Sequence, residues 1–251
     1  MGAAVGGLRL SGASQGRFPA ASFVSQAEYE GWVAQFAGTL GARGHFEQML
    51  ATNLAVEGAP LVQHGTCAPC LRPAALTSHG ASWAREQVCD CEDALPGHAR
   101  ALLHATLAEA MLQPWSRLLI VGPPAPVHRR LRALVREHVA MPVLPPPANT
   151  HRHHLVVAGE CLQHVADLAR AASRLRALTV PGGCLLATLP FRHRAAHTHA
   201  RPEKSGGGLD IGWDILTQLR AAGFVDATVL LYWSNELGYL GGHNFIVKAT
   251  A

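Results

Sequence analysis

The second half of this 251-residue sequence predicts an α/β fold with a mostly parallel sheet. Two short, unbroken apolar runs, at 117–122 and 154–158, are typical of buried parallel strands. Stretches with apolar residues at helical spacing follow both runs, and strands that alternate with helices pair in parallel through right-handed crossovers. Because such sheets bind ligands at the carboxyl ends of their strands, the ends of these two runs are candidate binding positions.

The other elements of this half follow from periodicity and turn signals after Pro114. Helical spacing covers 127–138, 160–178 and 212–222, and strands are expected at 142–144, 184–189, 227–233 and 244–249. The stretch 192–208 is polar and rich in His and Gly. Its length predicts either a lid over a site or a disordered loop.

The first half predicts helices around a cysteine-rich segment. Residues 1–24 lack a compact apolar core, which indicates a flexible leader, while helices are expected within 25–41, 45–54 and 97–112. Residues 62–98 hold four of the six cysteines among Gly, Pro and polar residues. We therefore divide the chain into a leader, a helical region with a cysteine module (25–113) and an α/β domain (114–251).

Charge and hydropathy exclude two classes of partner. The formal net charge of +4 comes mostly from scattered Arg, without the Lys/Arg run that follows a phosphate backbone, so we expect no nucleic-acid partner. No apolar run is long enough to cross a bilayer. The sequence thus predicts a soluble, cytoplasmic protein without a membrane partner, and it gives no oligomeric state.

Three segments of the second half carry a family resemblance. The run His154–Val165, the helical stretch 170–178 and the run Val180–Phe191, with its Pro-Gly-Gly turn, resemble the fourth strand, following helix and fifth strand of class I S-adenosylmethionine-dependent methyltransferases. Tyr232–Gly241 is similar to the C-terminal part of bacterial members, where two antiparallel strands finish the sheet. The resemblance implies a Rossmann-like methyltransferase sheet with helices on both faces.

The resemblance also implies a cofactor site at the ends of the first and fourth strands. Because Gly122 has no side chain, we expect the protein backbone there to approach S-adenosylmethionine closely. The residues expected to bind the cofactor are Gly122, Pro123, Ala158, Gly159, Glu160, Cys161, Gln163 and His164.

Several positions depart from the family pattern. The turn after the first strand reads Val121-Gly-Pro-Pro-Ala-Pro126, no carboxylate follows Leu144, and the connection to His154 is too short for the usual third strand. Losing charge-assisted contacts of about 1.5–3 kcal/mol each would weaken cofactor binding. Two hypotheses therefore stand: a methyltransferase acting on a small molecule, or a catalytically silent zinc-containing relative that binds a protein partner or a small ligand.

The cysteine spacing predicts a structural zinc site. Cys67 and Cys70 form a pair of the C-x-x-C type, and Cys89 and Cys91 form a tighter pair, separated from the first by 18 residues. Four thiolates complete a tetrahedron and leave no open position, and the resembling bacterial subgroup often carries such a module. Chance clustering and disulfides are the alternatives. His64, His79 or His98 could replace one sulfur, whereas Cys161 and Cys184 are expected to pack in the core.

Candidate substrate residues lie in two places, and the sequence assigns no catalytic residue. His197, His199 and Glu203 in the long loop could supply a general base or simply be solvated. The segment 233–239 combines aromatic residues, a carboxylate and a Gly, which suits either a substrate wall or a plain hairpin. The residues expected to bind substrate are His199, Trp233, Glu236 and Tyr239.

Overall fold

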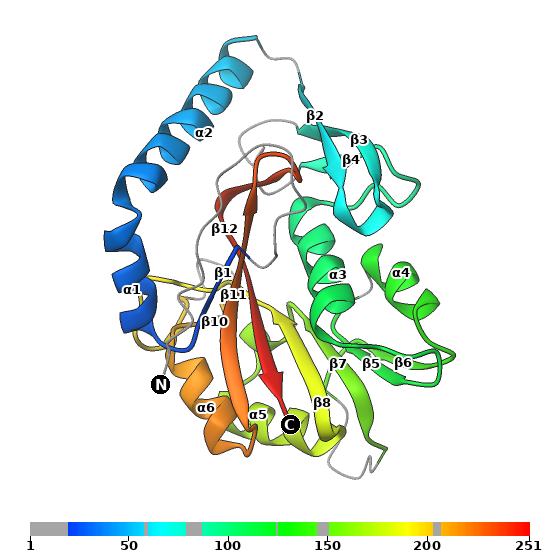
Figure 1. The fold of residues 1–251 in the computed structure, drawn as a ribbon. Helices are drawn as coiled ribbons and strands as arrows, with labels where there is room; N and C mark the ends of the chain where they lie inside the picture. The colour runs from blue at the N-terminus through cyan, green and yellow to red at the C-terminus, as the bar shows by residue number, and fades with distance from the viewer. Residues whose placement is uncertain (1–19, 58–59, 79–86, 124, 145–150, 203–206) are drawn as a thin grey trace, which may run out of the picture.

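A seven-stranded mixed sheet forms the centre of the protein (Figure 1). The structure, a computed structural model, describes residues 20–57, 60–78, 87–123, 125–144, 151–202 and 207–251. The strand order is β1-β11-β12-β8-β7-β5-β6. The strands are β1 (Ala21–Phe23), β5 (Arg117–Val121), β6 (Glu137–Met141), β7 (His153–Gly159), β8 (Thr179–Thr188), β11 (Asp226–Ser234) and β12 (Tyr239–Thr250).

Side chains of the central strands alternate between the two faces of the sheet, and helices cover both faces, as the sequence predicts. Leu119 and Val121 of β5 pack with α5 (Leu168–Leu178) and α6 (Asp214–Ala221), whereas Leu118 and Ile120 pack with α3 (Gly97–Glu109) and α4 (Val127–Ala133). Each face therefore has its own buried apolar core.

The sheet is parallel at one end and antiparallel at the other. Strands β6, β5, β7 and β8 run parallel. Strand β12 runs antiparallel to β8, β11 antiparallel to β12, and β1 antiparallel to β11. Strand β11 thus points the same way as β8, and its end at Ser234 lies on the same edge as the carboxyl ends of the parallel strands.

The structure corrects the expected helix 127–138 and strand 142–144. Helix α4 ends at Ala133, and residues 137–141 instead form the parallel edge strand β6. The apolar spacing of 137–141 suits a helix as well as a strand, and only the pairing of Arg117–Val121 with this segment makes it a strand. Within the described residues β7 follows β6 directly along the chain, so the usual third strand is missing, as the short connection predicts.

Three further segments differ from expectation. The predicted helix 160–178 is divided into a 3-10 turn η2 (Leu162–His164) and α5, because the Asp167 side chain accepts the Arg170 N–H at 2.9 Å and caps a new helix. In the polar stretch after β8, β9 (His199–Ala200) pairs with β10 (Leu209–Asp210). Residues 21–23, at the end of the expected leader, form β1.

The N-terminal half wraps around the antiparallel end of the sheet. Helices α1 (Gln26–Gln35) and α2 (Ala37–Glu57) run along the left of Figure 1, and α2 leads to the cysteine module. The module is a three-stranded sheet of β2 (Leu61–Cys67), β3 (Arg72–Ser78) and β4 (Val88–Cys89), with the 3-10 turn η1 (Ala68–Cys70) between β2 and β3. In the described part of the chain, no helix has the length and apolar character to cross a membrane.

A fully buried arginine ties this module to the turn between β11 and β12. Arg100 on α3 donates to the carbonyl oxygens of Leu237 (2.6 Å), Gly238 (3.0 Å) and Gln87 (3.3 Å). Its guanidinium also lies over the Tyr239 ring, 5.4 Å from the centroid. Since a buried charge without such partners is costly, the module and the turn are expected to order together.

We expect acid to destabilise the sheet through His153. This residue opens β7, is 4% exposed, and neither ring nitrogen has a hydrogen-bond partner among the described residues. Burial, with a smaller effect of Arg117, lowers its pKa to about 4. Because the unfolded chain binds the proton near pH 6.5, the stabilisation is present above that pH and is lost as the pH falls toward 4.

Urea denaturation at several pH values checks this expectation. The free energy of unfolding should fall by up to about 3 kcal/mol between pH 7 and pH 4 from this ring alone. A His153→Leu variant should lose that part of the decrease, whereas His138→Leu, at an exposed position, should keep it. The same decrease in all three proteins would contradict the assignment.

Candidate cofactor edge and cysteine cluster

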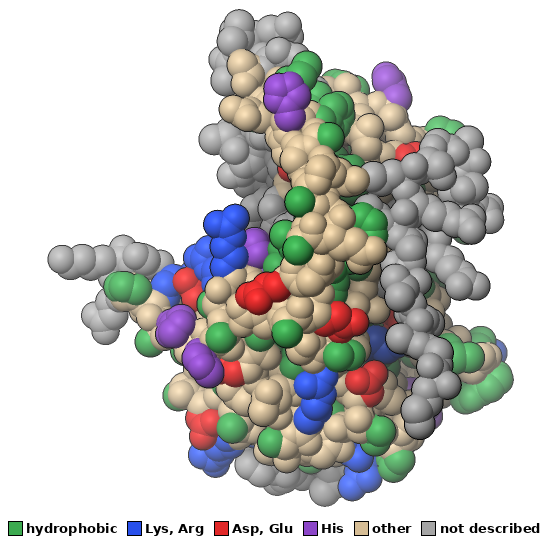
Figure 2. Space-filling view, turned by 60° about the vertical axis from the view of Figure 1, so that its left-hand side comes forward, with side chains coloured by type: hydrophobic (Ala, Val, Ile, Leu, Met, Phe, Trp, Pro, Cys, Tyr) green, Lys and Arg blue, Asp and Glu red, His purple; other side chains and the backbone are tan. Residues whose placement is uncertain are grey.

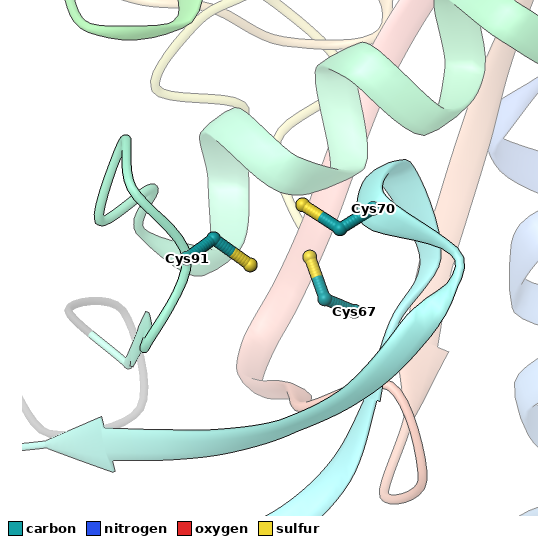
Figure 3. Close-up of side chains that lie close together, drawn as sticks. All are labelled: Cys67, Cys70 and Cys91. Carbon is teal, nitrogen blue, oxygen red and sulfur yellow. The ribbon is translucent and has the colours of Figure 1, made fainter.

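Three of the four cysteines of the module form a tight cluster. The sulfur atoms of Cys67, Cys70 and Cys91 all lie within 4.8 Å of one another. Figure 3 shows them pointing toward a common centre, two from the turn between β2 and β3 and one from the loop before α3. Cys89 lies outside this group of three, but it is buried, and the thiols of Cys67 and Cys91 are close enough to lower its pKa. None of the four is in a disulfide.

Crowding of these thiols determines their protonation. The hydrogen bond from the Cys67 thiol lowers the pKa of Cys89 to about 5 and raises that of Cys67. Burial raises the pKa of Cys91 to about 12. The cluster without a cation therefore keeps protons on Cys67 and Cys91 at neutral pH, and a divalent metal would have to displace them.

Arginines surround the cluster. Arg130 on α4 donates to Cys70 Sγ at 3.6 Å and pairs with Asp93, and Arg72 lies close enough to Cys91 for a hydrogen bond. Four thiolates around a divalent ion carry a net negative charge, which these guanidinium groups would offset. The donor set and its surroundings fit a metal site, with the buried Cys89 beside Cys67 and Cys91 as the candidate for the fourth ligand. His64 and His98 are exposed, and His79 lies outside the described residues.

The structure gives Gly122 a different role from the one expected. Gly122 follows β5 with φ +139°, and a Cβ built on it would lie 2.1 Å from the carbonyl oxygen of Gly159 on β7. Its smallness therefore permits the close approach of two strand ends, and a ligand is not needed to explain it. Gly159 itself has room, since the nearest atom to its Cβ position would be Val121 O at 3.9 Å.

The turn after β7 combines strain with an unsatisfied group. Glu160 has φ +48°, in the left-handed region, and its N–H donates to Thr188 O at 3.0 Å. The Gln163 carboxamide oxygen is buried and has no hydrogen-bond partner among the described residues. Backbone strain and orphaned polar atoms are found together at ligand sites. The predicted residues Cys161 and His164 belong to the same turn, at the carboxyl edge of the sheet, and Ala158 is buried in β7 just before it.

The ends of the neighbouring strands β5 and β6 offer fewer polar groups to a ligand than the turn after β7 does. Strand β6 ends at Met141, and Pro142, Val143 and Leu144 follow it without a carboxylate. Pro123 is exposed beside Gly122 and offers no N–H. The end of β6 therefore lacks an acidic residue, as the sequence predicts.

Two of the predicted substrate residues lie in separate environments. The Trp233 indole donates to Glu47 of α2 at 2.8 Å, so it belongs to the interface between α2 and the sheet. Tyr239 is fully buried against α3, where its hydroxyl lies 3.2 Å from His104 Nδ1. The structure does not bring these two side chains into one site.

The other predicted substrate residues are on the surface. Glu236 is exposed in the turn after β11, and its carbonyl accepts the Thr66 N–H at 2.9 Å. His199 is exposed on the β9–β10 hairpin, which also carries Arg201 in an ion pair with Asp210. His197 is likewise exposed, and Glu203 lies outside the described residues.

Sequence reasoning missed an aromatic group beyond the end of β8, against the middle of β12. The His193 ring lies 5.5 Å from Tyr29 and 5.7 Å from Phe245, centroid to centroid, and the Trp213 indole donates to His193 O at 2.8 Å. Burial, helped by Arg194, lowers the pKa of His193, so its neutral ring can accept a proton. The polar composition of 192–208 concealed this residue, because its partners come from α1 and β12.

Several solved structures are similar to this chain, each at less than 25% identity and with a TM-score below 0.5. A methyltransferase of Haloferax volcanii, solved with a methyltransferase activator, is 10% identical and covers 58% of this chain and 86% of its own, with a TM-score of 0.44. N-methyltransferase NodS of Bradyrhizobium japonicum, solved with S-adenosyl-L-homocysteine, is 14% identical over 64% and 92% of the two chains (TM-score 0.39). The 1,6-didemethyltoxoflavin-N1-methyltransferase of Burkholderia thailandensis is 18% identical over 61% and 76% (TM-score 0.39). No protein-family profile and no curated protein sequence matches the chain.

Proposed function

We propose that this chain is an S-adenosylmethionine-dependent methyltransferase for a small molecule and that its cysteine cluster holds a structural zinc ion. The turn after β7 carries the proposal. Strained Glu160 and the unpartnered Gln163 oxygen lie at the carboxyl edge, where sheets of this topology bind ligands. The motif resemblance of residues 154–165 supports the same position.

The residues at the ends of β5 and β7 would hold the cofactor. When bound, S-adenosylmethionine supplies an electrophilic methyl group, and the protein contributes mainly by positioning the acceptor in line with it. Ala158 to Cys161 provide backbone groups beside Gly122, and the Gln163 oxygen can accept a hydrogen bond from an amino group. His164, exposed at the end of η2, would flank the same ligand.

A structural zinc ion suits the cluster better than a catalytic metal ion does. Four sulfur ligands leave no position for water or substrate, so the ion would organise the module and take no part in methyl transfer. Through Arg100, the same module holds the turn between β11 and β12.

Calorimetric titration with S-adenosylmethionine and S-adenosylhomocysteine tests the cofactor site. We expect saturable binding of both ligands and a roughly tenfold loss of affinity in Gln163→Leu, the cost of about one hydrogen bond. Gln218→Leu is a matched control, because Gln218 on α6 also has a buried oxygen without a described partner. Unchanged affinity in Gln163→Leu would place the site elsewhere.

One observation favours the second candidate, a catalytically silent methyltransferase-like protein. The end of β6 lacks the acidic residue, so a ribose would lose charge-assisted contacts there. If neither ligand gives heat or a thermal shift at millimolar concentration, the enzyme proposal fails and this candidate replaces it.

A further inference from the structure

A cavity of about 350 Å³ lies between α2 and the carboxyl end of β11. On the helix side it is lined by residues one turn apart, including Leu40, Arg43 and Phe46. On the sheet side it is lined by alternate residues of one face, Leu231 and Trp233, and by Asn235 just beyond the strand. Figure 2 views the molecule from this flank, and charged side chains of both signs are mixed over the face it shows.

One wall of this cavity is held in place by a closed network. The Trp233 indole donates to Glu47 Oε1 (2.8 Å), and the Arg43 guanidinium lies over the same ring, 4.3 Å from its centroid. Arg43 pairs with Glu47 at 3.2 Å and donates to Gly241 O at 2.8 Å, while Gly241 N–H donates to Glu47 at 3.1 Å. The aromatic wall is thus preformed before any ligand binds.

The same network determines the charge of the ligand. Arg43 and Glu47 neutralise each other, and the other lining side chains are aromatic, aliphatic, hydroxyl or amide groups. An ionic ligand would be desolvated there without a counter-charge, which is costly. Planar apolar molecules suit a space between Trp32, Phe46 and Trp233, and its volume falls in the range of small-molecule sites.

The cavity lies on the edge of the sheet that carries the proposed cofactor turn. Strand β11 points the same way as β8, and it is three strands from β7, about 14 Å at the usual strand spacing. The contacting rings of Phe245, on β12, and His193, after β8, come from the two strands between β11 and β7. A ligand anchored under α2 would therefore extend along this edge toward the turn after β7.

We propose that this cavity binds a neutral, planar, largely apolar small molecule. The further assignment of this molecule as the methyl acceptor rests on the proposed function. Ligand binding to the cavity does not, and it can be measured without the cofactor.

A cavity-filling variant tests the binding site. Ala42 is exposed on α2 and lines the cavity, so Ala42→Trp adds volume without removing packing, and Ala37→Trp makes the same change at an exposed position outside the lining. With 2-naphthol as the probe in saturation-transfer NMR, we expect binding to the wild type and to Ala37→Trp. Ala42→Trp should lose at least tenfold in affinity, and Phe46→Ala should lose less.

The outcomes separate this inference from the proposed function. No binding of 2-naphthol to the wild type, or equal affinity in the two tryptophan variants, would overturn the cavity site. S-Adenosylhomocysteine titrations of the same variants should be unchanged, because the lining does not include the turn after β7. Loss of cofactor binding with probe binding intact would remove only the acceptor role.

Discussion

Replacing Cys89 with serine is expected to release one zinc ion per chain and to unfold the cysteine module. The hydroxyl is a poor ligand for zinc, and structural zinc ions contribute about 10–16 kcal/mol in small modules of this type. The module has few large apolar side chains of its own among its described residues, so its order would depend on the ion. Loss of the site should also loosen the turn that Arg100 holds between β11 and β12.

Elemental analysis and limited proteolysis measure these effects. Wild-type protein purified without chelator should contain close to one zinc, and Cys89→Ser should contain little and be cut within residues 62–98. The central sheet should still unfold cooperatively, because both of its faces are covered by helices. Cys161→Ser is the matched control, since this buried thiol lies outside the cluster. No metal in the wild type, or free reactivity of all four thiols, would refute the zinc site.

Replacing Gly122 with alanine is expected to cost about 3 kcal/mol or more of stability. The new Cβ would lie 2.1 Å from the Gly159 carbonyl oxygen, and φ +139° is unfavourable for any residue with a side chain. Relief would require two buried strand ends to separate. Urea denaturation should therefore show a much lower midpoint for Gly122→Ala than for the wild type.

Gly159→Ala is the matched control for this change. The two glycines face each other, yet the nearest atom to a Cβ on Gly159 is 3.9 Å away, so the variant should lose little stability. If Gly122→Ala were as stable as Gly159→Ala, the close approach of these strand ends would be wrong. The Gly159 variant also remains folded enough for the titrations that test the cofactor edge.

Local patterns were sufficient where neighbours in sequence determine the structure. The apolar runs 117–122 and 154–158 became β5 and β7, and the expected helices on both faces of a parallel sheet are confirmed. Zinc-ligand spacing selected four cysteines, and the fold brings three of them, Cys67, Cys70 and Cys91, into one cluster. The hydrophobic period and the spacing of metal ligands are properties of short segments, so both can be recognised in the sequence without knowledge of the fold.

The tertiary structure decided the features that depend on contacts between residues far apart in the sequence. Residues 137–141 became a strand because β5 pairs with them, and Gly122 is constrained by Gly159, a residue on another strand. One wall of the cavity forms where Arg43 and Glu47 contact Trp233, nearly 200 residues away in the sequence, and no sequence motif predicts this contact. Such contacts arise only when the core has brought the elements together, so the amino-acid order alone could not reveal them.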